Sequence, residues 1–136
     1  MQDLNQYALI FEQAVVWGDM DAFGHLNNVM YYRYMESARL DYFEKIDLFA
    51  YKVLPVVRSN ECEYLRPVYY PDQLKIAVRV MDMRNSSFTM DYLMWSELQQ
   101  SVVATGKAVM VCIDPETKNK KIIPEQLKEK INTLEK

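Results

Sequence analysis

The residues best suited to chemistry lie together in one short segment, WGDMDAFGHLNN at residues 17–28. This segment contains two closely spaced aspartates, Asp19 and Asp21, the only histidine of the chain, His25, and a pair of asparagines. A carboxylate can act as a nucleophile or a general base, and an imidazole can hold or transfer a proton. Aspartates before a helix also serve as turn or capping residues. The segment is therefore either a catalytic loop or a structural turn, and the sequence around it is needed to distinguish the two.

The tyrosine-rich sequence after this loop predicts the main helix of the chain over residues 29–46. Asn27 or Asn28 is suited to cap it, because an asparagine side chain accepts hydrogen bonds from the free N–H groups of a first turn. Those N–H groups and the positive end of the helix dipole would favour an oxyanion beside the loop. Apolar residues at helical spacing mark one helix face, namely Tyr31, Met35, Ala38 and Tyr42.

Strand-like segments account for most of the remaining chain. Apolar alternation or continuous apolar character predicts strands at residues 7–16, 53–66, 73–83, 87–98 and 101–113. We expect hairpin turns at Asn85-Ser86 and Gln99-Gln100, and a C-terminal helix over residues 124–134 with Pro124 as its first residue. One long helix packed on one face of an antiparallel sheet is an α+β domain. The strand at 101–113 is apolar on both faces, which suggests contact with another subunit.

The composition indicates a folded protein with one domain, residues 1–136. The net charge of −3 argues against a general nucleic-acid surface, which would need clustered Lys and Arg. The N-terminus lacks the pattern of a signal peptide and no apolar run is long enough to span a membrane, so we expect a cytoplasmic protein. Cys62 and Cys112 lack the spacing of a metal or redox motif, and we expect buried free thiols.

The segment WGDMDAFGHLNNVMYYRYMESAR resembles the signature of acyl-CoA thioesterases of the 4-hydroxybenzoyl-CoA thioesterase type. The matching positions are Asp19, Asp21, Gly24, His25, Asn28, Tyr31 or Tyr32, Glu36 and Arg39. A second segment, EYLRPVYYPDQL at 63–74, resembles the tyrosine, arginine-proline and aspartate element of the same family. The resemblance implies the hotdog fold, a long central helix wrapped by a five-stranded antiparallel sheet. It also outweighs the interpretation of Asp21 as a mere turn residue.

The resemblance implies hydrolysis of an acyl-CoA thioester to a free acid and coenzyme A. Asp21 would be the nucleophile or the general base, and the backbone N–H near Asn28 would bind the carbonyl oxygen. Gly24 would let the loop turn sharply beside the ligand. Plant acyl-carrier-protein thioesterases use a histidine at this place together with an asparagine two residues earlier, but here that position is Phe23. His25 is therefore expected to orient Asp21 or a water, or only to hold the loop.

The same resemblance implies how the rest of the substrate is bound. Arg84, Ser86 and Ser87 would meet the phosphates of coenzyme A, although a solvated hairpin turn explains them equally well. Ser59 and Asn60, next to Arg58, would border the thioester from a facing subunit. The family implies a homodimer or a homotetramer built as a dimer of dimers, and no metal or redox cofactor.

Two other assignments stay open at this stage. Glu36 and Arg39 are three residues apart on the helix and are expected to form a structural ion pair, with Glu36 as an alternative catalytic carboxylate. Asp19 is expected to serve as a turn residue. Alternative functions are an acyl-carrier-protein thioesterase, which the acidic composition disfavours, and a non-catalytic acyl-CoA binding domain, which turnover by the purified protein would exclude.

Overall fold

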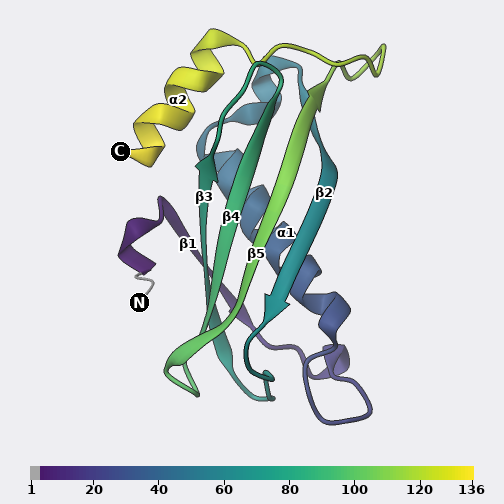
Figure 1. The fold of residues 1–136 in the computed structure, drawn as a ribbon, viewed down its shortest axis with the longest axis vertical. Coiled ribbons are helices and arrows are strands. Elements are labelled where there is room, and N and C mark those ends of the chain that lie inside the picture. The colour runs from purple at the N-terminus through teal and green to yellow at the C-terminus, as the bar shows by residue number, and fades with distance from the viewer. Residues whose placement is uncertain (1–3) are drawn as a thin grey trace.

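The computed structural model describes residues 4–136, which form a five-stranded antiparallel sheet and two α-helices (Figure 1). The main elements are β1 (Leu9–Ala14), α1 (Asn28–Lys45), β2 (Leu54–Tyr64), β3 (Gln73–Met81), β4 (Ser87–Ser96), β5 (Ser101–Ile113) and α2 (Glu125–Glu135). Short 3-10 helices lie at Leu4–Gln6, Trp17–Asp19 and Leu48–Tyr51. The predicted α+β architecture, with its long helix and five antiparallel strands, is confirmed.

The sheet has the strand order β1-β3-β4-β5-β2, so β1 and β2 are its edges. β2 is 11 residues long and pairs only with β5, and its register shifts between Val57 and Ser59. Most of its residues are exposed on both faces of the strand. An edge of this length offers a row of unpaired backbone N–H and C=O groups to another strand.

Helix α1 packs along one face of the sheet, as Figure 1 shows. The buried residues of the helix include Tyr31, Met35, Ala38 and Tyr42, the four that its spacing predicted. Gly106 of β5 lies very close to one of them, Met35, because a Cβ at Gly106 would lie 2.6 Å from the Met35 sulfur. Absence of a side chain at this one position therefore lets the helix approach the sheet.

Element ends differ slightly from the sequence predictions. Both predicted hairpin turns lie where expected but are longer than the predicted pairs: the β4–β5 connection covers residues 97–100 and includes Gln99-Gln100, and the β3–β4 connection covers residues 82–86 and includes Asn85-Ser86. Pro124 is the N-cap residue that precedes α2, so its prediction as the first helical residue is wrong.

At the end of α2, the Glu135 carboxylate accepts hydrogen bonds from the Tyr42 hydroxyl and the Val80 N–H. These bonds fix α2 against α1 and β3.

Cys112 is buried and Cys62 is partly buried, and both are free thiols. Burial raises the pKa of each thiol to about 11. Within residues 4–136, no helix combines the length and the apolar character needed to cross a membrane.

Candidate active site

The loop between β1 and α1 closes on itself through backbone hydrogen bonds. The Asp21 N–H donates to the His25 carbonyl over 2.8 Å, and the Gly24 N–H donates to the Asp21 carbonyl over 3.3 Å. Gly24 has φ +82, a left-handed conformation that a side chain disfavours, and a Cβ there would meet no other atom within 4 Å. The turn therefore depends on glycine for its backbone conformation, as expected.

The Asp21 carboxylate is held by one of its two oxygens. Its Oδ1 accepts hydrogen bonds from the backbone N–H of Phe23 at 2.8 Å and of His25 at 3.2 Å. Its other oxygen, Oδ2, has no hydrogen-bond partner within residues 4–136. The side chain is thus fixed in orientation while one oxygen remains available to a ligand.

The N-terminus of α1 lies beside this carboxylate. Asn27 is the cap, and its side chain accepts from the Val29 N–H at 3.1 Å, which decides between the two predicted caps. The next residue, Asn28, is the first of the helix, and its N–H donates to nothing in the described chain. Asp21, His25 and Asn28 line one hollow of about 310 Å³, together with Leu26, Tyr31, Tyr64, Leu65, Arg66 and Pro67. The three predicted catalytic residues therefore converge.

The His25 ring stacks edge-on against Tyr69, with 5.3 Å between ring centroids. Its backbone groups, not its ring, bond to Asp21. Next to it, the Leu26 N–H donates to the Val68 carbonyl over 2.8 Å. The two sequence motifs, residues 17–39 and 63–74, thus meet at this loop.

Asp19 was expected to serve as a turn residue, but its side chain bonds to helix α1 instead. Its Oδ2 accepts a hydrogen bond of 2.7 Å from the Tyr34 hydroxyl, which in turn accepts from the Val16 N–H at 3.1 Å. Burial, and then this carboxylate, raise the pKa of Tyr34 to about 12. The Asp19 carbonyl also accepts from the Asn27 N–H at 3.0 Å. Sequence analysis did not identify Tyr34, although its place three residues after Tyr31 puts it near the same helix face.

Tyr64, at the end of β2, joins the site from the sheet. Its hydroxyl donates to the Asn28 carbonyl over 2.9 Å, and its ring packs edge-on against Tyr31 with centroids 4.8 Å apart. Burial raises the pKa of both phenols to about 12. The end of β2 is therefore fixed to the start of α1, a contact that the sequence did not predict.

The other residues predicted to bind substrate form a separate group: Arg84, Ser86 and Ser87 were expected to meet coenzyme A, and Ser59 and Asn60 to border the thioester from a facing subunit. Ser59, Arg84 and Ser87 line a hollow of about 350 Å³ with Arg58, Asp82, Thr89 and Val109. Arg84 is also paired with Asp82 at 3.2 Å. Asn60 and Ser86 do not line this hollow, and the Ser86 carbonyl is occupied by the Cys112 N–H. This hollow includes Arg58 and Ser59 from the middle of β2 and Arg84 from the β3–β4 connection, whereas Asp21 shares its hollow with Tyr64, the last residue of β2. The β3–β4 connection and the loop before α1 lie at opposite ends of the sheet (Figure 1).

A family model described as the thioesterase-like superfamily matches residues 15–131. This chain belongs to that superfamily. The match covers both motifs, α1 and strands β2 to β5. It confirms the family and the enzyme class, a thioester hydrolase, that the sequence motifs indicated.

Named relatives agree with this assignment. The chain is 29% identical over 119 residues to the long-chain acyl-CoA thioesterase FadM of Escherichia coli (strain K12), covering 85% of this chain and 90% of that protein. It is 26% identical over 127 residues to a 1,4-dihydroxy-2-naphthoyl-CoA hydrolase of Synechococcus elongatus, covering 88% and 91%. The crystal structure of a thioesterase from Thermus thermophilus, complexed with coenzyme A and Zn, superimposes with a TM-score of 0.83 at 32% identity and 96% coverage of both chains.

In this thioesterase-family chain, Glu36 behaves as the predicted ion-pair residue. It contacts Arg33 at 3.1 Å and Arg39 at 3.8 Å, and half of its side chain is exposed. Arg39 is buried and also donates to the Tyr92 hydroxyl over 3.0 Å. Glu36 does not line the hollow that holds Asp21.

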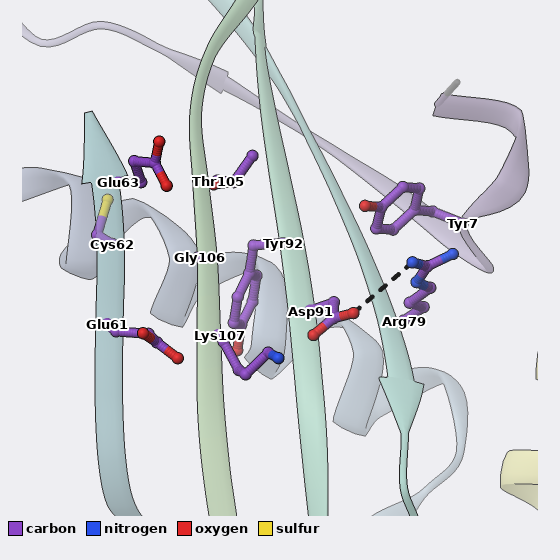
Figure 2. A pocket seen from close by; sticks show the side chains of 10 residues that line it. All are labelled: Tyr7, Glu61, Cys62, Glu63, Arg79, Asp91, Tyr92, Thr105, Gly106 and Lys107. Carbon is purple, nitrogen blue, oxygen red and sulfur yellow. Dashed lines mark ion pairs between the residues drawn. The ribbon is translucent and has the colours of Figure 1, made fainter. Parts of the chain in front are cut away.

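The outer face of the sheet carries a further hollow of about 470 Å³, which contains none of the predicted site residues (Figure 2). Charges alternate along one row of paired strands there, in the order Arg79, Asp91, Lys107 and Glu61. Arg79 pairs with Asp91 at 3.6 Å and lies over the Tyr7 ring at 4.4 Å. Alternating charges on paired strands stabilise a sheet face, and the side chains of Arg79 and Asp91 are only 26% and 20% exposed.

Proposed function

We propose that this chain hydrolyses acyl-CoA thioesters to a free acid and coenzyme A, with Asp21 as the catalytic carboxylate. One observation carries the proposal: a carboxylate held through Oδ1 shares a hollow with the uncommitted N–H of Asn28. The Oδ2 atom supplies attack and the helix N-terminus supplies the oxyanion site. The relatives that act on acyl-CoA thioesters support this assignment.

Two routes use the same groups. As a general base, Oδ2 takes a proton from water while the water oxygen bonds to the thioester carbon. As a nucleophile, Oδ2 itself bonds to that carbon, and water then hydrolyses the resulting anhydride. In both routes the C–S bond breaks, the thiolate of coenzyme A leaves and takes a proton, and charge develops on the carbonyl oxygen. A backbone donor at that oxygen is worth about 3–4 kcal/mol in the transition state.

We also propose that the active unit is a homodimer joined through β2. This strand is a long exposed edge, and its two ends carry different halves of the site, Asp21 at one and Arg84 at the other. Antiparallel pairing of β2 with a second copy would bring the Arg84 end of one subunit near the Asp21 end of its partner. Arg58, Arg84 and nearby hydroxyls would then bind the phosphates, while Asp21 of the other subunit reaches the thioester.

The first test compares thiol release by the parent and by Asp21→Asn over a panel of acyl-CoAs. The asparagine side chain can still accept from the Phe23 and His25 N–H groups, so the loop should persist while the charge is lost. We expect a loss of about 10²-fold or more in kcat. Glu36→Gln is the matched control and should keep nearly full activity. Equal rates for the parent and Asp21→Asn, or loss in Glu36→Gln alone, would overturn the assignment.

The shared site can be tested by mixing two inactive or weakened variants, Asp21→Asn and Arg84→Ala. A mixed dimer contains one site with both substitutions and one site with neither. Activity should therefore rise when the two variants are unfolded and refolded together. Activity that stays at the average of the separate variants would contradict a site built between subunits, and a monomer mass by ultracentrifugation would contradict the dimer itself.

A further inference from the structure

Tyr64 connects the edge strand β2 to the first residue of α1. It is the last residue of β2, and its hydroxyl donates a hydrogen bond of 2.9 Å to the Asn28 carbonyl. Figure 1 shows the end of β2 beside the start of α1. The second sequence motif contains Tyr64 but assigns it no role. Its contacts therefore need a physical explanation of their own.

The Asn28 carbonyl does not need this hydrogen bond to be satisfied. In an α-helix the carbonyl of one residue accepts from the N–H four residues later, so the Tyr32 N–H is the regular donor to Asn28. The Tyr64 hydroxyl is a second donor, on a side chain that is 43% exposed, and water can replace such a donor at little cost. Burial raises the pKa of Tyr64 to about 12, so the hydroxyl keeps its proton and donates at neutral pH. The bond therefore contributes more to the geometry of the helix start than to stability.

The same helix residue carries the candidate oxyanion donor. Asn28 lines the hollow that holds Asp21, and within residues 4–136 its N–H donates to no other group. The direction of this N–H therefore depends on the bonds made by the groups around it. On the loop side, the Asn27 N–H donates to the Asp19 carbonyl over 3.0 Å. On the sheet side, the Tyr64 hydroxyl holds the Asn28 carbonyl. The two bonds flank the donor and fix its direction.

Tyr64 is itself held firmly, because the chain at the end of β2 is bonded to β5. The N–H groups of Leu65 and Arg66 both donate to the Val103 carbonyl, over 2.9 and 3.1 Å. Tyr64 pairs with β5, and its ring packs edge-on against the buried ring of Tyr31, with centroids 4.8 Å apart. The backbone and ring of Tyr64 are therefore fixed on the sheet without the help of its hydroxyl.

We propose that Tyr64 is a positioning residue, which acts through Asn28 to hold the oxyanion donor in the direction of the thioester carbonyl. This inference rests on the proposed hydrolysis of acyl-CoA thioesters and adds a residue to its machinery. A donor already fixed in direction needs no reorganisation when negative charge develops on the carbonyl oxygen. The benefit therefore falls on the transition state, and loss of the hydroxyl should lower kcat with KM nearly unchanged.

The first test compares Tyr64→Phe with the control Tyr51→Phe in thiol release from acyl-CoAs. Phenylalanine at position 64 keeps the ring contact with Tyr31 and removes only the hydroxyl. The Tyr51 hydroxyl makes no hydrogen bond within residues 4–136, and Tyr51 does not line the hollow of Asp21. We expect Tyr64→Phe to lower kcat by roughly 3–10-fold, which is less than the ~10²-fold loss on removal of an oxyanion donor. Tyr51→Phe should keep both kcat and KM. An unchanged kcat in Tyr64→Phe, or a loss that lies in KM alone, would overturn the proposal.

Two analogues separate the oxyanion interaction from binding of the substrate ground state. The trifluoromethyl ketone analogue of hexanoyl-CoA hydrates to a tetrahedral species that presents an oxygen to the donor, whereas S-hexyl-CoA is a thioether without a carbonyl group. Tyr64→Phe should weaken binding of the ketone by the same factor as it lowers kcat, and S-hexyl-CoA should bind this variant and the parent equally. Equal weakening of both analogues would indicate a general structural effect and overturn the positioning role.

Hydrogen exchange separates this inference from the proposed function. If the parent releases no thiol from any acyl-CoA, the proposed hydrolysis fails, and exchange of the Tyr32 amide still tests the anchor, because that N–H bonds to the Asn28 carbonyl. Exchange that is several-fold faster in Tyr64→Phe than in the parent and Tyr51→Phe supports the anchor. Equal exchange in all three proteins overturns it.

Discussion

Replacement of Tyr34 by phenylalanine tests how the catalytic loop is held on α1. The Tyr34 side chain is 3% exposed, and its hydroxyl donates to the Asp19 carboxylate at 2.7 Å while accepting from the Val16 N–H at 3.1 Å. A hydrogen bond to a charged group contributes about 1.5–3 kcal/mol, and a backbone N–H left without a partner adds a smaller cost where water can reach it. Because Val16 is half exposed, we expect Tyr34→Phe to lower the free energy of unfolding by about 2–3 kcal/mol.

The same change should reduce catalysis without abolishing substrate binding. The Asp19 carbonyl accepts from the Asn27 N–H, so loss of the Tyr34 bond loosens both the loop and the helix cap. A displacement near 1 Å at the reacting groups can cost up to about 10²-fold in rate, and we expect roughly tenfold in kcat with little change in KM. Urea unfolding and thiol release measure the two effects. Tyr32→Phe is the control, because the Tyr32 hydroxyl makes no hydrogen bond in the described chain. Equal behaviour of the two variants would refute the positioning role of Tyr34.

Three further predictions concern other parts of the molecule. Gly106→Ala should destabilise the fold by about 1–3 kcal/mol, since its Cβ would overlap the Met35 sulfur at 2.6 Å, and Met35→Ala should restore part of the loss, both measured by urea unfolding. Burial raises the pKa of Tyr31 to about 12 from an ordinary value of 10.0, so the stability that the protonated phenol contributes should be complete below pH 10 and disappear as the pH rises through about 12. The free energy of unfolding of the parent and of Tyr31→Phe, measured across this pH range, tests this dependence. Equal pH slopes for the two proteins would contradict it. Cys62 and Cys112, whose thiol pKa values are raised to about 11, should react with a disulfide reagent at pH 8 far more slowly than after unfolding, as thiol titration will show.

The loop and its helix could be predicted from sequence because their signals are local. The helix starts at Asn28, one residue before its predicted start, since Asn27 supplies the cap in the expected way. The strand at 101–113 has the predicted bounds, because it is paired on both sides along nearly all its length. The strand predicted at 7–16 is shorter, at Leu9–Ala14, because an edge strand ends where its one partner stops pairing.

Long-range geometry could not be predicted in the same way. Asp21 and Arg84 line different hollows. Strand order and direction, not sequence spacing, place the loop before α1 and the β3–β4 connection at opposite ends of the sheet (Figure 1). Asn60 and Ser86 were predicted to bind substrate along with their neighbours, but neither lines the hollow that holds Ser59 and Ser87. Asn60 follows Ser59 in a strand, where successive side chains point to opposite faces. The Ser86 carbonyl accepts a backbone hydrogen bond from Cys112. Tyr34 and Tyr64 were not predicted, because tyrosines also fill ordinary cores, and the hydrogen-bond partners of these two lie 15 or more residues away.

Asp21 shows why a turn residue and a catalytic residue are not exclusive interpretations of the same side chain. A carboxylate has two oxygens, and the Asx-type turn of this loop uses only Oδ1, through the N–H groups of Phe23 and His25. The turn therefore orients Oδ2 without occupying it, and it does so in the short loop whose next element is the start of α1. A carboxylate on a longer loop, or on one without these hydrogen bonds, would have to become ordered whenever a substrate binds, and that loss of conformational entropy would weaken binding. The hydrogen bonds to Phe23 and His25 thus give Asp21 the role of a turn residue. The same bonds would hold its carboxylate ready for attack beside the Asn28 N–H.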